Sequence, residues 1–249
     1  MGPLNSLSIE DQASFHTFGF GATQPSPFHC VHHAFEHQAC LHPHNVAVED
    51  FEHKITYSEL DRQSNCLATH LRTRGIGTDS RVCLLVERSI PMAVGILAIL
   101  KAGAAYVPLD GSVASSSSLE HVLRDSGASI VLALKKFSHR VSDTPVLCLD
   151  EIECECASPC TKPEDTASSQ SSCYLIYTSG THHLLTIFLL TKSLSGTTGL
   201  PKGVDVTHGN VTNCEIHSSV TSPSHAMFQW YAWNLETLEW PLAVESVSS

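Results

Sequence analysis

Glycine, hydroxyl side chains and a lysine gather between residues 173 and 204. An apolar run, Cys173-Tyr-Leu-Ile-Tyr-Thr178, leads into Ser179-Gly180-Thr181, and Gly196-Thr-Thr-Gly-Leu-Pro-Lys-Gly203 follows later. Glycines let backbone amides approach an anion closely, hydroxyls donate hydrogen bonds to phosphate oxygens, and a lysine supplies a positive charge. This composition is typical of a phosphate-binding loop.

The loop differs from a Walker A motif. That motif requires Ser or Thr directly after its lysine, whereas Gly203 follows Lys202 and Pro201 precedes it. On this stretch alone, a surface turn rich in Gly and Thr remains the alternative.

Alternating helix and strand patterns surround this loop. Thr56 begins a capping-box pattern with Glu59, and the helix it predicts ends at Gly75. A second helix is expected between Ser89 and Gly103, and a third over 119–125. Strands are expected over 81–87, 104–107, 129–134, 146–149 and 173–178. The alternation predicts an α/β fold with a mostly parallel sheet, helices on both faces and ligands at the carboxyl ends of strands.

Three stretches resemble motifs of one family. Tyr177-Thr-Ser-Gly180 joined to Thr197-Thr-Gly-Leu-Pro-Lys-Gly203 spells the signature phosphate loop of the adenylate-forming (AMP-binding) superfamily. Ile55-Thr-Tyr-Ser-Glu-Leu60 and the stretch from Leu100 to Asp110 resemble early core motifs of amino-acid adenylation domains in nonribosomal peptide synthetases. The resemblance covers about residues 30–213, and it implies the N-terminal, incomplete portion of an adenylate-forming-enzyme fold.

The resemblance also implies a chemistry. In such domains an amino-acid carboxylate attacks the α-phosphate of ATP, magnesium pyrophosphate leaves, and the acyl-adenylate passes to the phosphopantetheine thiol of a carrier protein. The motif match implies that the residues facing the phosphates are Ser179, Thr197, Thr198, Gly199 and Lys202. It assigns no catalytic residue, and Lys101 and Asp110 are interpreted as structural: a cation at a helix end and a turn residue.

The phosphate loop is interrupted. Ser179-Gly-Thr181 recurs as Ser195-Gly-Thr197, so an insertion occupies about residues 181–196. A retained intron would explain this mostly apolar segment, and a regulatory insertion is the alternative. No later family motif is recognisable after Asn213, so we expect a truncated domain that is inactive alone. The alternatives are a non-catalytic remnant or mis-annotated gene product, and a fragment of an acyl-CoA synthetase.

The expected organisation is a flexible lead-in over 1–27, a partial adenylation domain over 28–213 and an unassigned tail over 214–249. The net charge of −11 and the scattered Lys and Arg disfavour nucleic acid and anionic membranes as partners. No apolar run approaches the length of a membrane span, and a reducing cytoplasm is expected.

No metal site is expected from the spacing of Cys and His. The densest cysteine group, from Cys148 to Cys160, lacks paired CxxC spacing, and His32-His33 and His182-His183 are interpreted as surface residues.

Overall fold

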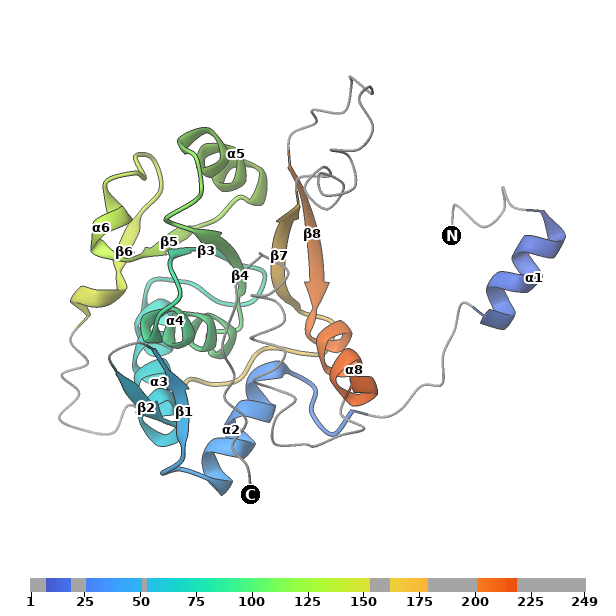
Figure 1. Cartoon of the computed structure of the whole chain (residues 1–249), viewed down its shortest axis with the longest axis horizontal. Helices are drawn as coiled ribbons and strands as arrows, with labels where there is room; N and C mark the ends of the chain where they lie inside the picture. Colours follow the sequence, from blue (N-terminus) through green and yellow to red (C-terminus); the bar gives the residue numbers. More distant parts are fainter. Residues whose placement is uncertain (1–7, 19–25, 51–52, 153–161, 179–200, 219–249) are drawn as a thin grey trace, which may run out of the picture.

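A computed structural model describes residues 8–18, 26–50, 53–152, 162–178 and 201–218 (Figure 1). In this part of the chain a six-stranded sheet has the order β6-β5-β3-β4-β7-β8. The strands in that order are β6 (Val146–Cys148), β5 (Ile130–Ala133), β3 (Arg81–Val86), β4 (Ala105–Asp110), β7 (Ser172–Thr178) and β8 (Lys202–Thr207). All neighbours pair in parallel except β7 and β8, which are antiparallel. The predicted mostly parallel α/β sheet is confirmed.

Helices cover both faces of this sheet. Alternate residues of β3 face opposite sides, as in any strand. Val82, Leu84 and Val86 share a core with α3 (Tyr57–Thr73) and α4 (Ile90–Lys101), whereas Cys83 and Leu85 pack with Leu119 of α5 (Ser116–Ser126). The strand is buried on both sides, which explains its almost continuous apolar sequence.

Helix α3 begins and ends as its sequence predicts. The Thr56 hydroxyl accepts a hydrogen bond from the Glu59 amide at 3.3 Å, and Gly75 adopts φ +79° just beyond the helix. The reciprocal half of the capping box is absent from the described contacts of Glu59, whose carboxylate accepts hydrogen bonds from Arg62 and Gln63 instead.

Helix α4 also begins and ends near its predicted residues, although Ser89 does not cap it with its side chain. The Ser89 hydroxyl donates to the Glu87 carbonyl at 3.0 Å. Gly103 follows the helix at φ +88°, and an added Cβ would lie 2.6 Å from Thr166 Oγ1. Conformation and close packing therefore both favour glycine there.

The N-terminal region contains more regular structure than its sequence suggests. The sequence predicts a lead-in over 1–27, yet α1 (Ile9–Phe18) forms within it, with the Ser8 hydroxyl accepting from the Asp11 amide at 3.1 Å. Helix α2 (Val31–Leu41) and a two-stranded sheet, β1 (Val46–Glu49) and β2 (Lys54–Thr56), follow. His32 is buried at 1% exposure, so the predicted surface position for this residue is wrong.

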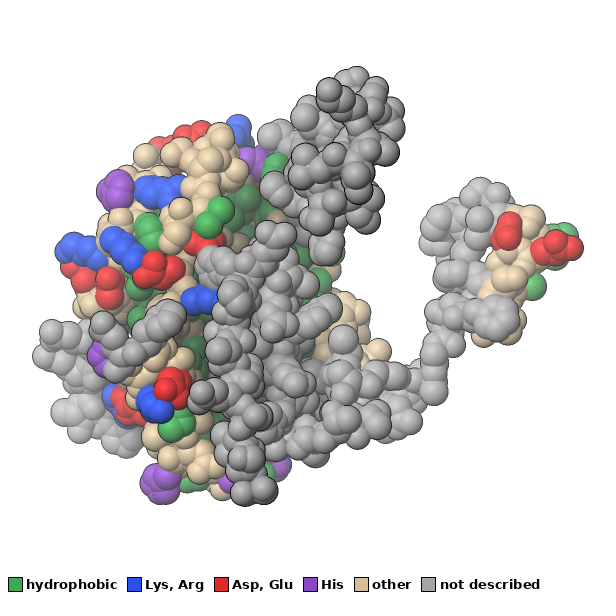
Figure 2. Space-filling model, viewed as in Figure 1, with side chains coloured by type: hydrophobic (Ala, Val, Ile, Leu, Met, Phe, Trp, Pro, Cys, Tyr) green, Lys and Arg blue, Asp and Glu red, His purple; other side chains and the backbone are tan. Residues whose placement is uncertain are grey.

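Short elements complete the described chain: α6 (Lys135–Ser138), the 3-10 helix η2 (Leu149–Glu151) and α8 (His208–Ser218). Helix α8 continues through residue 213, where the expected domain would end. On the face shown in Figure 2, acidic and basic side chains are interspersed, and ion pairs such as Lys136–Glu87 join them. None of the described helices has the length and apolar character required to cross a membrane.

Candidate functional site

The antiparallel pairing of β7 and β8 brings the two separated halves of the phosphate-loop motif together. Tyr177 pairs with Gly203 and Thr178 with Lys202. The first half of the motif therefore leaves the sheet beside the point where the second half enters it (Figure 1). This is also the carboxyl end of β7, whose neighbour β4 runs parallel to it. Ligands of open α/β sheets bind at this end.

Of the five predicted site residues, Lys202 is the one that lies within the described part of the chain. It begins β8, its side chain is exposed, and it forms no ion pair with any residue in the described ranges. An ammonium group in this setting is free to contact an anionic ligand. The other four predicted residues, Ser179, Thr197, Thr198 and Gly199, lie outside the described residues, as does the insertion at about 181–196.

Helix α5 contacts both halves of the motif. His121 Nε2 lies 2.8 Å from the Pro201 carbonyl oxygen, and because a carbonyl only accepts, the imidazole donates. The Tyr177 hydroxyl donates to Asp125 Oδ2 at 2.6 Å. Burial and the Asp125 carboxylate raise the pKa of Tyr177 to about 12, so its hydroxyl stays protonated and able to donate.

His121 and Asp125 lie outside the motifs that the sequence makes recognisable, although a signal for them exists. His121 and Asp125 are four residues apart, so they share one face of α5. A polar pair on a helix that packs beside this strand could have indicated contacts with the phosphate-loop motif, because the strand is expected to lead into that motif.

Gly203 allows the Tyr177 ring to lie close to the neighbouring strand. A Cβ at this position would come within 3.0 Å of the ring. A side chain at residue 203 would press against Tyr177 and disturb its hydrogen bond to Asp125. This gives a physical reason for glycine directly after Lys202.

Asp110 ends β4, the strand next to β7. Its Oδ1 accepts a hydrogen bond from the Ser112 amide at 2.7 Å, so its expected role in a turn is confirmed. The Arg140 guanidinium donates to the carbonyls of Gly111 and Ala114, which fixes the same turn.

The interpretation of Lys101 as a cation at a helix end describes only part of its role. Lys101 is the last residue of α4, but it is 2% exposed and reaches across to α3. Its ammonium lies 2.6 Å from Asp61 Oδ1, 2.8 Å from Ser64 Oγ and 2.8 Å from Asn65 Oδ1. Burial lowers its pKa, while the adjacent Asp61 carboxylate acts in the opposite direction. Lys101 therefore joins two helices.

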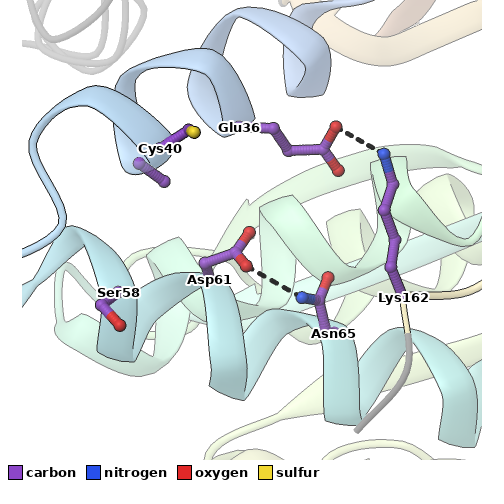
Figure 3. Close-up of a pocket in the computed structure, with 7 residues that line it drawn as sticks. Glu36, Cys40, Ser58, Asp61, Asn65 and Lys162 are labelled. Carbon is purple, nitrogen blue, oxygen red and sulfur yellow. Dashed lines mark hydrogen bonds and ion pairs between the residues drawn. The ribbon is translucent and has the colours of Figure 1, made fainter. Parts of the chain in front are cut away.

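A cavity of about 290 Å³ lies beside this network, between α2 and α3 (Figure 3). Its side chains bind one another: Glu36 pairs with Lys162 at 2.6 Å, and Asn65 Nδ2 donates to Asp61 Oδ2 at 3.0 Å. The cavity is lined by α2, α3 and the segment before β7, whereas the motif halves meet at the opposite end of β7. We therefore assign it no part in phosphate binding.

Comparisons with known proteins agree with the fold and the motif. The AMP-binding enzyme family model matches residues 35–182. The chain therefore belongs to the AMP-binding enzyme family.

Its relatives include fungal and bacterial proteins. Adenylate-forming reductase 06235 of Coprinopsis cinerea is 53% identical over 215 residues, which are 84% of this chain and 19% of the reductase. Zwittermicin A synthase ZmaJ of Bacillus cereus is 39% identical over 74% of this chain and 32% of its own length. The chain thus spans about a fifth to a third of these relatives.

Solved structures show the same fold. The nonribosomal peptide synthetase FmoA3, solved with α-methyl-L-serine-AMP bound, superposes with a TM-score of 0.68 at 26% identity. The match covers 86% of this chain and 22% of FmoA3. The N-terminal part of an adenylate-forming fold is therefore confirmed for this chain.

Proposed function

We propose that the chain forms part of an ATP site that activates a carboxylate as an acyl-adenylate. The family resemblance implies that this carboxylate belongs to an amino acid. The observation that carries this proposal is the pairing of Thr178 with Lys202, which brings both halves of the phosphate-loop motif to one end of the sheet. In the reaction a carboxylate oxygen attacks the α-phosphorus of ATP. The bond from the α-phosphorus to the bridging oxygen breaks, and pyrophosphate leaves. A magnesium ion, which the family resemblance implies, would offset the charge on the phosphates.

Within this site the exposed Lys202 ammonium would contact the phosphates. Ser179, Thr197, Thr198 and Gly199 would contribute hydroxyls and amides, as the family motif implies. Catalysis of this kind depends on positioning and on stabilising the charge that develops. The contacts from His121 and Asp125 to the two strand ends support such positioning.

For the acceptor of the acyl group we propose the phosphopantetheine thiol of a carrier protein. The likeness to peptide synthetases supports this choice. A second candidate is reduction of the activated acyl group in a longer protein. Two Coprinopsis cinerea relatives, at 53% and 49% identity, are named adenylate-forming reductases, which is the observation that supports this second candidate.

We further propose that adenylate formation requires more protein than these 249 residues. The chain matches only 19% of the reductases and 22% of FmoA3, which supports this proposal. The chain alone should show no pyrophosphate exchange with any carboxylate. Clear exchange above background by the purified chain would refute it.

A graft tests the activity itself. Residues 28–213, with Thr181–Gly196 removed, would replace the matching part of a related adenylation domain. We expect pyrophosphate exchange that depends on the host's carboxylate substrate. Loss of exchange in Lys202→Ala, with exchange retained in Lys54→Ala, would support a phosphate role for Lys202. An inactive but folded graft would favour the non-catalytic remnant.

Replacing the acceptor separates the remaining alternatives. With the activity restored, acyl transfer to a carrier protein can be compared with transfer to coenzyme A. Transfer to coenzyme A alone would favour the acyl-CoA synthetase alternative over carrier loading.

A further inference from the structure

A cysteine and two histidines converge at the start of α2. Cys30 Sγ and one ring nitrogen each from His32 and His33 all lie within 4.8 Å of one another. Cys30 is 0% exposed and His32 1% exposed, whereas the His33 side chain is 26% exposed, so the cluster reaches from the interior to the surface. Buried sulfur and imidazole donors at such separations are typical of a metal site, after a small adjustment of the side chains.

A carboxylate from a distant part of the chain meets the two histidines. Asp165, in the segment before β7, contacts His33 Nε2 directly through Oδ2, and its Oδ1 lies 3.6 Å from His32 Nε2. The carboxylate therefore lies where it could supply an oxygen as the fourth donor of a site formed with Cys30, His32 and His33.

The hydrogen bonding of His32 is incomplete. Neither Nδ1 nor Nε2 has a hydrogen-bond partner among the residues the structure describes. A buried polar atom without a partner is unfavourable, and each such atom calls for an explanation. A metal ion bound by one ring nitrogen of His32 would supply such an explanation.

We propose that Cys30, His32, His33 and Asp165 bind one zinc ion in a closed, four-coordinate structural site. Thiolate, imidazole and carboxylate are the ligands that Zn²⁺ takes in proteins, and a buried mixture of sulfur and nitrogen donors disfavours Mg²⁺ and Ca²⁺. On binding, the Cys30 thiol loses its proton to solvent as the sulfur–zinc bond forms. This replaces the sequence-based expectation of no metal site.

His208 lies beside the site but is not among the proposed ligands. Its Nδ1 accepts a hydrogen bond from the Val31 amide at 3.3 Å, so in the neutral ring Nε2 carries the hydrogen. The His32 and His208 rings are 5.6 Å apart at 75°, so His208 positions His32 and the start of α2.

The ion would link segments that are far apart in sequence. Cys30, His32 and His33 belong to the start of α2, and Asp165 to the chain entering β7. This is the end of β7 opposite Thr178, so the ion would link α2 to the chain that enters β7, at the other end of the strand from the paired motif residues Thr178 and Lys202 (Figure 1). Its role would be structural, and it does not depend on the proposed adenylate chemistry.

Metal analysis of the purified full chain tests the proposal. We expect one tightly held zinc ion per chain, and after exchange to Co²⁺ a thiolate-to-cobalt charge-transfer band. Cys30→Ser should abolish that band. Cys40→Ser, which alters an exposed cysteine on the same helix, should retain it. No retained zinc after incubation with added Zn²⁺, or a band unaffected by Cys30→Ser, would overturn the site.

A second measurement starts from the wild-type chain, so its first result does not depend on the folding of any variant. Removing the metal from the wild-type chain with a chelator should lower its melting temperature, and added zinc should restore it. Asp165→Asn should weaken zinc binding by at least about tenfold, whereas His37→Asn, at an exposed position of α2, should leave it unchanged. A melting temperature insensitive to both chelator and zinc would contradict the proposal.

Discussion

Two lysines of the family motifs illustrate how differently the same side chain can be used. Lys101, at the end of α4, is buried and binds Asp61, Ser64 and Asn65 of α3. Lys202, at the start of β8, is exposed and has no ion pair in the described part of the chain. The first has its charge satisfied within the protein, and the second has its charge available for a ligand.

The role of a motif residue therefore depends on its burial and its partners. Both lysines lie in stretches that resemble adenylation-domain motifs, and both follow apolar or small residues. Only the structure shows that Lys101 stabilises the packing of two helices, while Lys202 follows the loop that the β7–β8 pairing closes. Substitutions at the two positions should therefore affect different properties.

The largest effect on stability is expected for Lys101→Ala. Removing one partner of a buried ion pair leaves the other groups unsatisfied, and typically costs about 3–5 kcal/mol. Because the Asp61 side chain is 32% exposed, water can partly solvate it, and the lower end of that range is expected. Urea unfolding would measure this loss. A change below about 1 kcal/mol would mean that the network contributes little.

Tyr177→Phe should have a smaller effect. Loss of the hydrogen bond to Asp125 should reduce the free energy of unfolding by about 0.5–1.5 kcal/mol. The sign of the pH dependence follows from the raised pKa. This stabilisation is present below pH 10 and is lost as pH rises toward the folded-state value of about 12.

Unfolding measured at neutral and alkaline pH would check this account of Tyr177. The wild-type chain should lose stability more steeply above pH 10 than Tyr177→Phe does. Asp125→Asn should lie between them, because it removes the charge but keeps an acceptor. Equal slopes for all three proteins would contradict the contact between α5 and β7.

The smallest effect on stability is expected for Lys202→Ala. An exposed side chain without an ion pair contributes little to folding, and a change within about 0.5 kcal/mol is expected. Lys54→Ala is a control at another exposed lysine, which pairs with Glu49 across β1 and β2. A large loss of stability in Lys202→Ala, but not in Lys54→Ala, would contradict the predicted difference between Lys202 and Lys101.

Much of the fold could be predicted from the sequence because its signals are local. The cap at Thr56, the glycines at 75 and 103, and the apolar runs of the strands each predict an element that the structure contains. Helix α1 could not be found in this way, because its sequence has no clear apolar face. The strand β8 was also missed, since it contains Gly203 and its first four residues are all exposed, as in a loop.

The candidate site was only partly predictable. The motif predicts Lys202, but its pairing with Thr178 depends on two strands separated by an interrupted loop. The contacts from His121 and Asp125 depend on how α5 packs against that pair. His32-His33 looked like a surface pair because burial of His32 arises from segments far away in the chain, those that contain Asp165 and His208.

The central claim is that the two motif halves form one phosphate site to which Lys202 contributes its charge. It can be tested by measuring ATP affinity in two grafts of residues 28–213 onto a related adenylation domain. One graft keeps Thr181–Gly196, and the other joins Gly180 directly to Thr197. Joining brings the hydroxyls and amides of the motif into one short turn, so they can converge on a phosphate.

The joined graft should bind ATP more tightly than the interrupted graft. In the joined graft Lys202→Ala should weaken binding by about 1.5–3 kcal/mol, roughly tenfold to a hundredfold, because a charge-assisted contact is lost. Lys54→Ala should leave the affinity unchanged. Equal ATP affinity for the two grafts, with no change on Lys202→Ala in either, would show that the insertion is tolerated and that Lys202 does not contact the phosphates.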